Sequence, residues 1–167
     1  MGVALAVDIK NVVPVPVNRK FVIQSVQTNS DNDFVEYFRK VPNERFLYTF
    51  RVVKPATSFT ISITLSTVKS KRIMYKIDKL NGCQFLKNQM MNKFLSQIYR
   101  ALVVNNTLFE CPIRANVYFL RNLINPKIMP HFHPLGYYQL SIRIEMPENR
   151  KPLIMEILSK YFVLAIK

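Results

Sequence analysis

Two cysteines and two histidines are the residues of this 167-residue chain whose types could carry special chemistry. Cys83 and Cys111 can be either a disulfide or a pair of buried free thiols, and their number alone does not decide between the two. His131 and His133 form an H-x-H pair, which on an extended backbone directs both rings to one side, as in some metal sites. No acidic or cysteine ligand lies nearby in the sequence, and prolines flank the pair. The pattern therefore favours an ordinary surface or rim loop, and we predict no metal site.

Catalytic signatures are absent from the sequence. It has only three glycines, so it contains no glycine-rich phosphate loop, and it has no G-x-S-x-G nucleophile motif. The ten acidic residues are scattered along the chain. Catalytic triads assemble in space, so a catalyst that uses His131 or His133 remains a third hypothesis behind two binding functions. We predict that the protein is not an enzyme, and we predict no cofactor.

The chain is strongly basic, with a formal net charge of +14. Such a charge is compatible with anionic partners, including nucleic acid, phospholipid headgroups and acidic polysaccharide. The lysines and arginines are dispersed, however, and the densest group is the short KSKR run at residues 69–72. No nucleic-acid-binding motif accompanies them. We therefore expect most of these charges to lie on solvent-facing positions of strands, and we expect no nucleic acid partner.

One helix is predicted, over residues 83–103. Apolar residues recur there at three- and four-residue steps while polar residues occupy the other positions, which is the pattern of an amphipathic helix. The apolar stripe consists of Leu86, Met90, Phe94, Ile98 and Leu102. Because the rest of the chain alternates like strands, this stripe is expected to pack on a sheet. A bridge between Cys83 and Cys111 would fasten it there.

The remaining segments predict a mainly β protein. Residues 46–53, 57–68, 72–78, 112–120 and 138–146 alternate apolar and polar residues, as half-buried antiparallel strands do. Residues 153–167 are apolar enough to be a buried strand or a short helix, and we expect mainly strand. Together these segments predict a two-sheet sandwich over residues 19–167, a single domain of sufficient length for a sizeable core. Residues 1–18 are expected to be an extended segment that is not a good signal peptide.

Three stretches carry a resemblance to a known family: YKIDKLNGCQFLKN at 75–88, FECPIRANVYFLRN at 109–122 and HPLGYYQLSIRI at 133–144. They resemble an uncharacterised insect family, domain of unknown function 1091, over about residues 45–165. That family is usually grouped with the ML lipid-recognition β-sandwiches. The resemblance implies a secreted, disulfide-bonded, immunoglobulin-like sandwich that holds a hydrophobic molecule between its sheets. This chain differs in lacking further N-terminal cysteines and a visible signal peptide.

The resemblance adds specific expectations about residues. It favours a Cys83–Cys111 disulfide, and in a secreted protein the Asn105-Asn106-Thr107 sequon is a candidate glycosylation site at Asn105. The candidate lining of a cavity between the sheets is Phe59, Ile61, Ile63, Leu65, Phe94, Ile98, Tyr138, Leu140, Ile142 and Ile144. The first hypothesis is therefore a secreted, monomeric, non-enzymatic carrier or sensor of a lipid or other hydrophobic ligand. The alternative is a cationic module with a solid core that binds an anionic protein, glycan or membrane surface.

Overall fold

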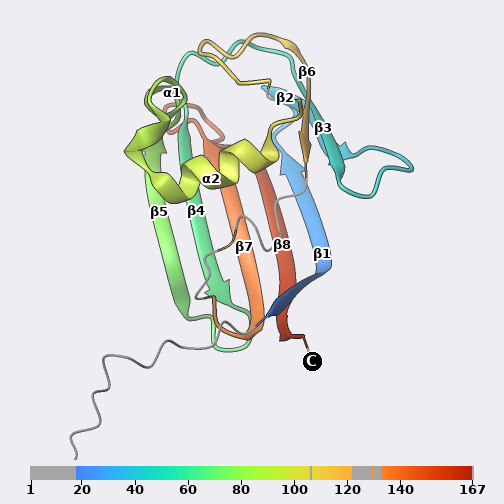
Figure 1. Cartoon of the computed structure of the whole chain (residues 1–167). Coiled ribbons are helices and arrows are strands. Elements are labelled where there is room, and N and C mark those ends of the chain that lie inside the picture. Colours follow the sequence, from blue (N-terminus) through green and yellow to red (C-terminus); the bar gives the residue numbers. More distant parts are fainter. Residues whose placement is uncertain (1–17, 106, 122–128, 130–132, 167) are drawn as a thin grey trace, which may run out of the picture.

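Two antiparallel sheets form the protein, as the sequence predicts. The computed structural model describes residues 18–105, 107–121, 129 and 133–166. The larger sheet has the order β1-β8-β7-β4-β5 and the smaller one the order β2-β3-β6 (Figure 1). In chain order the strands are β1 (Arg19–Ser30), β2 (Val35–Lys40), β3 (Leu47–Val52), β4 (Thr60–Thr67), β5 (Ile73–Asn81), β6 (Asn116–Arg121), β7 (Gly136–Glu145) and β8 (Leu153–Ala165). The C-terminal run is a strand, as expected.

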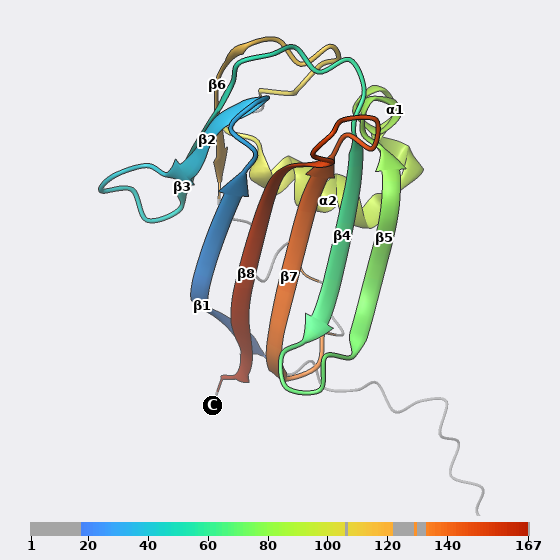
Figure 2. The ribbon, with the colours of Figure 1, turned by 180° about the vertical axis from the view of Figure 1, so that it is seen from behind.

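The large sheet has one covered and one open face. Ile61, Ile63 and Leu65 on β4 are buried, and they alternate with half-buried threonines and serines. The register pairs Ile61 with Ile144 and Ile63 with Ile142, so the apolar residues of neighbouring strands share the inner face. Seen from behind, the opposite face of this sheet is covered by none of the other helices and strands formed by the described residues (Figure 2). This is the two-sided pattern that the period-two alternation predicts.

The predicted helix is present, but it is not continuous. It consists of α1 (Gly82–Lys87), a 3₁₀ turn η2 (Gln89–Met91) and α2 (Lys93–Leu102). Asn88 and Asn92 lie between these pieces with extended or irregular backbone angles. The Asn92 side chain accepts a hydrogen bond from the Leu95 N–H at 2.9 Å and so caps α2. Asparagine favours such capping positions over helix interiors, and the prediction of one unbroken helix over 83–103 is wrong for this reason.

The interruption changes which residues of the segment are buried. Leu95, Ile98 and Tyr99 are the buried large residues of α2, whereas Met90 on the 3₁₀ turn is 72% exposed. The sequence predicts that Met90 belongs to the apolar stripe that packs on the sheet, and this prediction is wrong because the side chain is exposed. Helix α2 runs across the strands of the large sheet on its inner face (Figure 1). It occupies the space beside the small sheet, so helix and small sheet together cover the core.

The small sheet closes the core from the other side. Phe50 on β3 packs its ring against Tyr118 on β6, with 5.3 Å between ring centroids, and against Phe38 on β2 at 5.9 Å. These residues belong to the same buried cluster as the inner face of the large sheet and α2. The core therefore lies between one complete sheet and a mixed layer of helix and short strands.

Two further points complete the fold. Of the segment 1–18 that is expected to be extended, residues 1–17 lie outside the described residues. Among the described residues, no helix combines the length and apolar character that crossing a bilayer requires.

Candidate functional site: an apolar cavity between the layers

A cavity of about 170 Å³ lies inside the core. Its wall is almost entirely aliphatic and aromatic. The lining comprises Phe34, Val35, Phe38, Phe50, Val52, Lys54, Ala56, Phe59, Ile61, Phe85, Leu86, Leu95, Ile98, Tyr99, Leu102, Phe109, Ile113, Leu120, Ile142, Ile144, Met146, Ile154, Met155, Glu156 and Ile157. An engineered cavity of about 150 Å³ with a similar lining stays dry and binds benzene, so the size is sufficient for a small apolar guest.

Every layer of the fold contributes to this wall. Helix α2 supplies Ile98 and Leu102 from its inner side, and the small sheet supplies Phe50 and Val52 from β3. The inner face of the large sheet supplies the floor, including Ile142 on β7. The cavity therefore lies between the inner face of the large sheet on one side and α2 with the small sheet on the other.

The more accessible lining residues lie on connecting segments. Phe34 precedes β2, Met146 follows β7, and Ala56 and Phe59 lie between β3 and β4; all four are only partly buried. Lys54, on the same connection as Ala56, is exposed, and its ammonium lies 5.5 Å from the centroid of the Phe34 ring. These residues mark the side from which solvent approaches the cavity, and they place a positive charge there.

Besides Lys54, the described part of the wall carries two polar side chains, Tyr99 and Glu156, and both are engaged. The Tyr99 hydroxyl accepts a hydrogen bond from the Phe109 N–H at 2.8 Å. Burial raises the pKa of Tyr99, so its hydroxyl stays protonated near neutral pH. Glu156 forms an ion pair with Arg143 at 3.1 Å. The wall can therefore bind an apolar surface, and it offers little that would move a proton.

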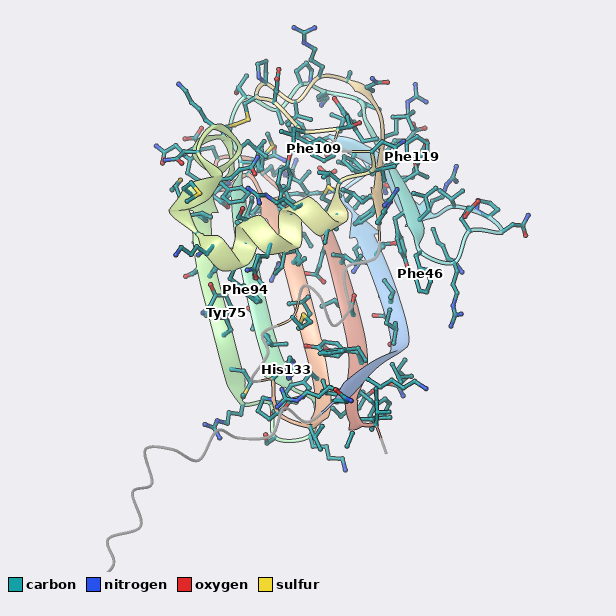
Figure 3. The ribbon with its side chains drawn as sticks, in the orientation of Figure 1. Phe46, Tyr75, Phe94, Phe109, Phe119 and His133 are labelled. Carbon is teal, nitrogen blue, oxygen red and sulfur yellow. A yellow bond between two sulfur atoms is a disulfide. The ribbon has the colours of Figure 1, made fainter. Side chains whose placement is uncertain are left out.

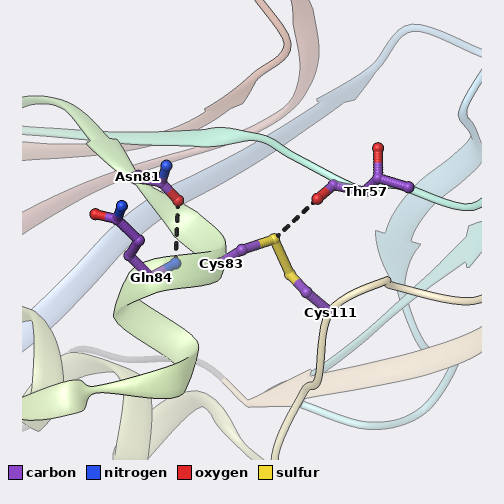
Figure 4. The surroundings of a disulfide bond; sticks show 5 residues. All are labelled: Thr57, Asn81, Cys83, Gln84 and Cys111. Atoms are coloured by element: carbon purple, nitrogen blue, oxygen red, sulfur yellow. Dashed lines mark hydrogen bonds between the residues drawn. A yellow bond between two sulfur atoms is a disulfide. The ribbon is translucent and has the colours of Figure 1, made fainter.

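The disulfide ties the helical segment to the chain that enters β6. Cys83 on α1 and Cys111 are bonded, with an S–S distance of 2.01 Å and 5.7 Å between their Cα atoms (Figure 4). This confirms the predicted pairing. The sulfur of Cys83 also lies 3.4 Å from the Thr57 carbonyl oxygen. A disulfide sulfur carries no hydrogen, so this approach is a contact and not a hydrogen bond.

The structure brings five of the ten predicted lining residues to the cavity: Phe59, Ile61, Ile98, Ile142 and Ile144. The other five do not line it. Ile63, Leu65, Tyr138 and Leu140 are buried further along the inner face of the large sheet, where bulky side chains fill the core. Phe94 packs on Tyr75 of β5, with 4.4 Å between ring centroids (Figure 3). That the first five contact a ligand stays a prediction.

Sequence reasoning missed much of the wall. Phe50 and Val52 lie in the alternating run that predicts β3, and that alternation places them on one face with Tyr48. Nothing in the sequence, however, assigns this face to the cavity rather than to a filled part of the core. Phe109 lies outside any strand or helix and therefore carries no periodic signal.

His133 is not on the surface, in contrast to the interpretation of H-x-H as a surface or rim loop. It is 3% exposed, and its Nε2 lies 2.8 Å from the Tyr161 hydroxyl. Its Nδ1 lies 3.1 Å from the Pro134 carbonyl, which can only accept. The neutral ring therefore donates from Nδ1 and accepts the Tyr161 proton at Nε2. His131 lies outside the described residues.

This histidine belongs to an aromatic cluster at the end of the large sheet opposite to the cavity (Figure 3). Its ring lies 4.3 Å from that of Tyr138 and 5.9 Å from that of Phe21. The Arg19 guanidinium donates to the His133 carbonyl. Desolvation is the main cause that lowers the pKa of His133, so the ring is neutral near physiological pH.

The other predicted site is Asn105, which is exposed at the end of α2 with a φ of 53°. Asn106 lies outside the described residues. Among the residues that the structure describes, no group of three or more His, Cys, Asp or Glu side chains is placed to hold a metal ion.

Comparison with known proteins gives one family. No curated protein matches the chain. A family model described as "Protein of unknown function (DUF1091)" matches residues 57–140, which is half of the chain. The matched region includes both cysteines, α1, α2 and strands β4 to β6, together with the first half of β7. The chain therefore belongs to this family of proteins of unknown function.

Proposed function

We propose that this protein is a non-enzymatic binding protein that holds a hydrophobic ligand in the cavity between its layers. The observation that carries the proposal is the cavity of about 170 Å³ with its apolar wall. Native cores are close-packed, and a void of this size leaves many wall atoms without partners. A guest that fills the void restores those contacts. The cavity also favours this function over a cationic module with a solid core.

The size of the cavity limits the guest. By comparison with the cavity that accepts benzene, a ring or chain of about six to eight carbon atoms fits. At about 0.8 kcal/mol per buried methylene, such a guest gains about 5–6 kcal/mol, which limits the affinity to a Kd of about 0.1 mM or weaker because association itself costs free energy. The proposed ligand is therefore a compact lipid or the apolar end of a longer one, and not a complete phospholipid.

Lys54 supports a second feature of the ligand. It is the exposed cation of the described lining, and it lies beside the accessible residue Phe34. A carboxylate or other anionic end group at this position would contribute up to about 1 kcal/mol, because Lys54 is exposed and solvent screens the pair. We infer that a short amphipathic acid, with its tail inside and its head at Lys54, is the chemical class that fits best.

We place the protein outside the cell. The disulfide supports this because such bonds persist in oxidising compartments and are rare in the cytosol. The exposed sequon asparagine, Asn105, is compatible with glycosylation there. The arrangement of two sheets around an apolar interior also supports a relationship to the ML lipid-recognition sandwiches, and we propose the protein as an extracellular carrier or sensor.

Calorimetric titration with hexanoate, octanoate, dodecanoate and hexadecanoate tests this function. The proposal predicts that the affinity rises with chain length until the cavity is full and then stops rising. The matching alcohols separate the apolar contribution from that of the charge: Lys54→Gln is expected to weaken the binding of the acids by about three- to fivefold and to leave the binding of the alcohols unchanged. Absence of binding across the series would refute the proposed function.

A further inference from the structure

We infer that the outer face of the small sheet is a docking site for an acidic protein segment that also presents apolar side chains. This surface is separate from the cavity, and the inference does not depend on the proposed ligand. We call it the arginine–aromatic face. Its residues are Tyr37 and Arg39 on β2, Arg51 on β3, and Val117, Phe119 and Arg121 on β6.

The strand register places these residues on one side. Phe50, Tyr118 and Leu120 point into the core, because they line the cavity or stack on one another there. Their neighbours in the strands must point away. Arg51 is paired with Tyr37 on one side and with Val117 on the other. Arginines and apolar or aromatic side chains therefore stand beside each other across the sheet.

Two members of the face are unusual for a solvent-facing strand. Val117 is 40% exposed and Phe119 is 45% exposed on β6, where alternation would place polar residues. Figure 3 shows Phe119 at the small sheet, on the side of the molecule away from Tyr75 and Phe94. Beside them is an open hollow, which is lined by Arg51, Val52, Val53, Ala115, Asn116 and Val117. Exposed apolar residues next to a hollow are typical of a contact surface.

Two of the three arginines, Arg39 and Arg51, contact neighbouring side chains. The Arg39 guanidinium lies over the Tyr37 ring, 4.2 Å from its centroid. Arg51 forms an ion pair with Glu36 at 3.0 Å. Arginine, tyrosine and phenylalanine are the residue types enriched in protein interfaces, and lysine is depleted. The cations on this face are all arginines, although lysines outnumber arginines in the chain.

Charge selects the partner among the possible occupants. A second copy would oppose the three arginines of the face with the same three arginines, so self-association is disfavoured. A bilayer would have to desolvate the guanidinium groups first, because arginine side chains reach further from the sheet than Val117 or Phe119. A protein segment with carboxylates for the arginines and apolar groups for Phe119 satisfies both parts of the surface.

Fluorescence anisotropy with a labelled peptide that alternates Glu with Tyr and Leu tests the inference on the full chain. We expect binding that weakens at high salt. The variant Arg39→Gln/Arg51→Gln/Arg121→Gln should bind about tenfold more weakly, and Phe119→Thr should separately lower the affinity by about tenfold. The control Lys69→Gln/Lys76→Gln/Lys79→Gln removes the same charge around β5 and should change the affinity less than about twofold.

Thermal unfolding of each variant shows whether it is folded, and Phe119→Thr keeps a β-branched residue in the strand for this purpose. Equal losses in the arginine and lysine variants, or no binding of the peptide, would overturn the inference. So would preferential binding of an oligothymidylate or of phosphatidylserine vesicles that depends on the same arginines. The cavity ligands measured in parallel are expected to bind all these variants equally, so failure here leaves the proposed function intact.

Discussion

Phe59 lies directly over Gly82: a Cβ atom added to Gly82 would come within 2.1 Å of the Phe59 ring. The two residues are also joined through the backbone, since the Gly82 N–H donates to the Phe59 carbonyl at 2.8 Å. Gly82 is the first residue of α1, and Phe59 lines the cavity. The absence of a side chain at Gly82 therefore allows Phe59 to form part of the wall.

Gly82→Ala is expected to destabilise the protein and to weaken ligand binding. Alanine normally favours a helix over glycine by about 1 kcal/mol. Here the new methyl group must displace the Phe59 ring, and overpacking of this kind costs about 1–3 kcal/mol. Chemical denaturation measures the change. The double variant Phe59→Ala/Gly82→Ala removes the clash, so its loss should be smaller than the sum of the two single losses; an additive result would contradict this account.

Removal of the disulfide by Cys83→Ala/Cys111→Ala is expected to lower the free energy of unfolding by about 3.5 kcal/mol. The bridge closes a loop with a sequence separation of 28, and most of its effect comes from restricting the unfolded chain. Urea denaturation of the variant and of the reduced native protein should give similar losses. A loss below about 1 kcal/mol would contradict this estimate.

Much of the fold follows from local pattern. The alternation of Ile61, Ile63 and Leu65 fixes the strand and its buried face, and the two cysteines with the resemblance give the correct pairing. The sequence also contains a signal for the break in the helix, because asparagines such as Asn88 and Asn92 prefer capping positions. The three- and four-residue spacing of the apolar residues nevertheless favours one continuous helix, and the prediction follows this spacing.

The cavity is a different case, because packing density depends on all layers at once. Ile61 and Ile63 have the same residue type on the same face of one strand, yet Ile61 lines the cavity and Ile63 does not. No periodic pattern distinguishes them. The burial of His133 depends in the same way on Tyr138 and Tyr161, which come from strands later in the chain.

His133 is expected to make stability depend on pH. Its pKa in the folded protein is lowered, so the unfolded chain binds a proton more readily below the ordinary value of about 6.5. The neutral His133 ring therefore contributes fully to the free energy of unfolding above about pH 6.5. This contribution is lost as the pH falls toward the pKa of His133 in the folded protein, and the free energy of unfolding then decreases by at most about 1.4 kcal/mol per pH unit. Burial raises the pKa values of the neighbouring Tyr138 and Tyr161, so neither tyrosine titrates in this range.

Denaturation of the native protein and of His133→Gln between about pH 7 and about pH 5 measures this effect. The variant should be less stable at neutral pH, because the hydrogen bond to Tyr161 changes, and it should show a flatter dependence on pH. If the free energy of unfolding of the variant changes with pH as steeply as that of the native protein, His133 is not the cause of the pH dependence.

Asn105 is expected to carry a glycan when the protein is made in a secretory eukaryotic host. It is exposed just beyond the end of α2, and close by the Thr107 N–H donates to the Val104 carbonyl. Mass spectrometry should show the added mass, which Thr107→Ala should abolish and Thr107→Ser should retain. An unmodified native protein from such a host would contradict the assignment of Asn105 as a glycosylation site.

Filling the cavity tests its role most directly. Val52 lines the cavity, so the additional volume of Val52→Phe has space to enter, and the protein should remain folded. Val163, fully buried away from the cavity, provides the matched control, because Val163→Phe has no such space and should cost about 1–3 kcal/mol. The decisive measurement is calorimetric titration of octanoate into the native protein and into Val52→Phe. We predict binding to the native protein and at least about tenfold weaker binding to the variant, at similar thermal stability. Equal binding to both proteins, or to neither, would contradict the proposal that the cavity holds the ligand.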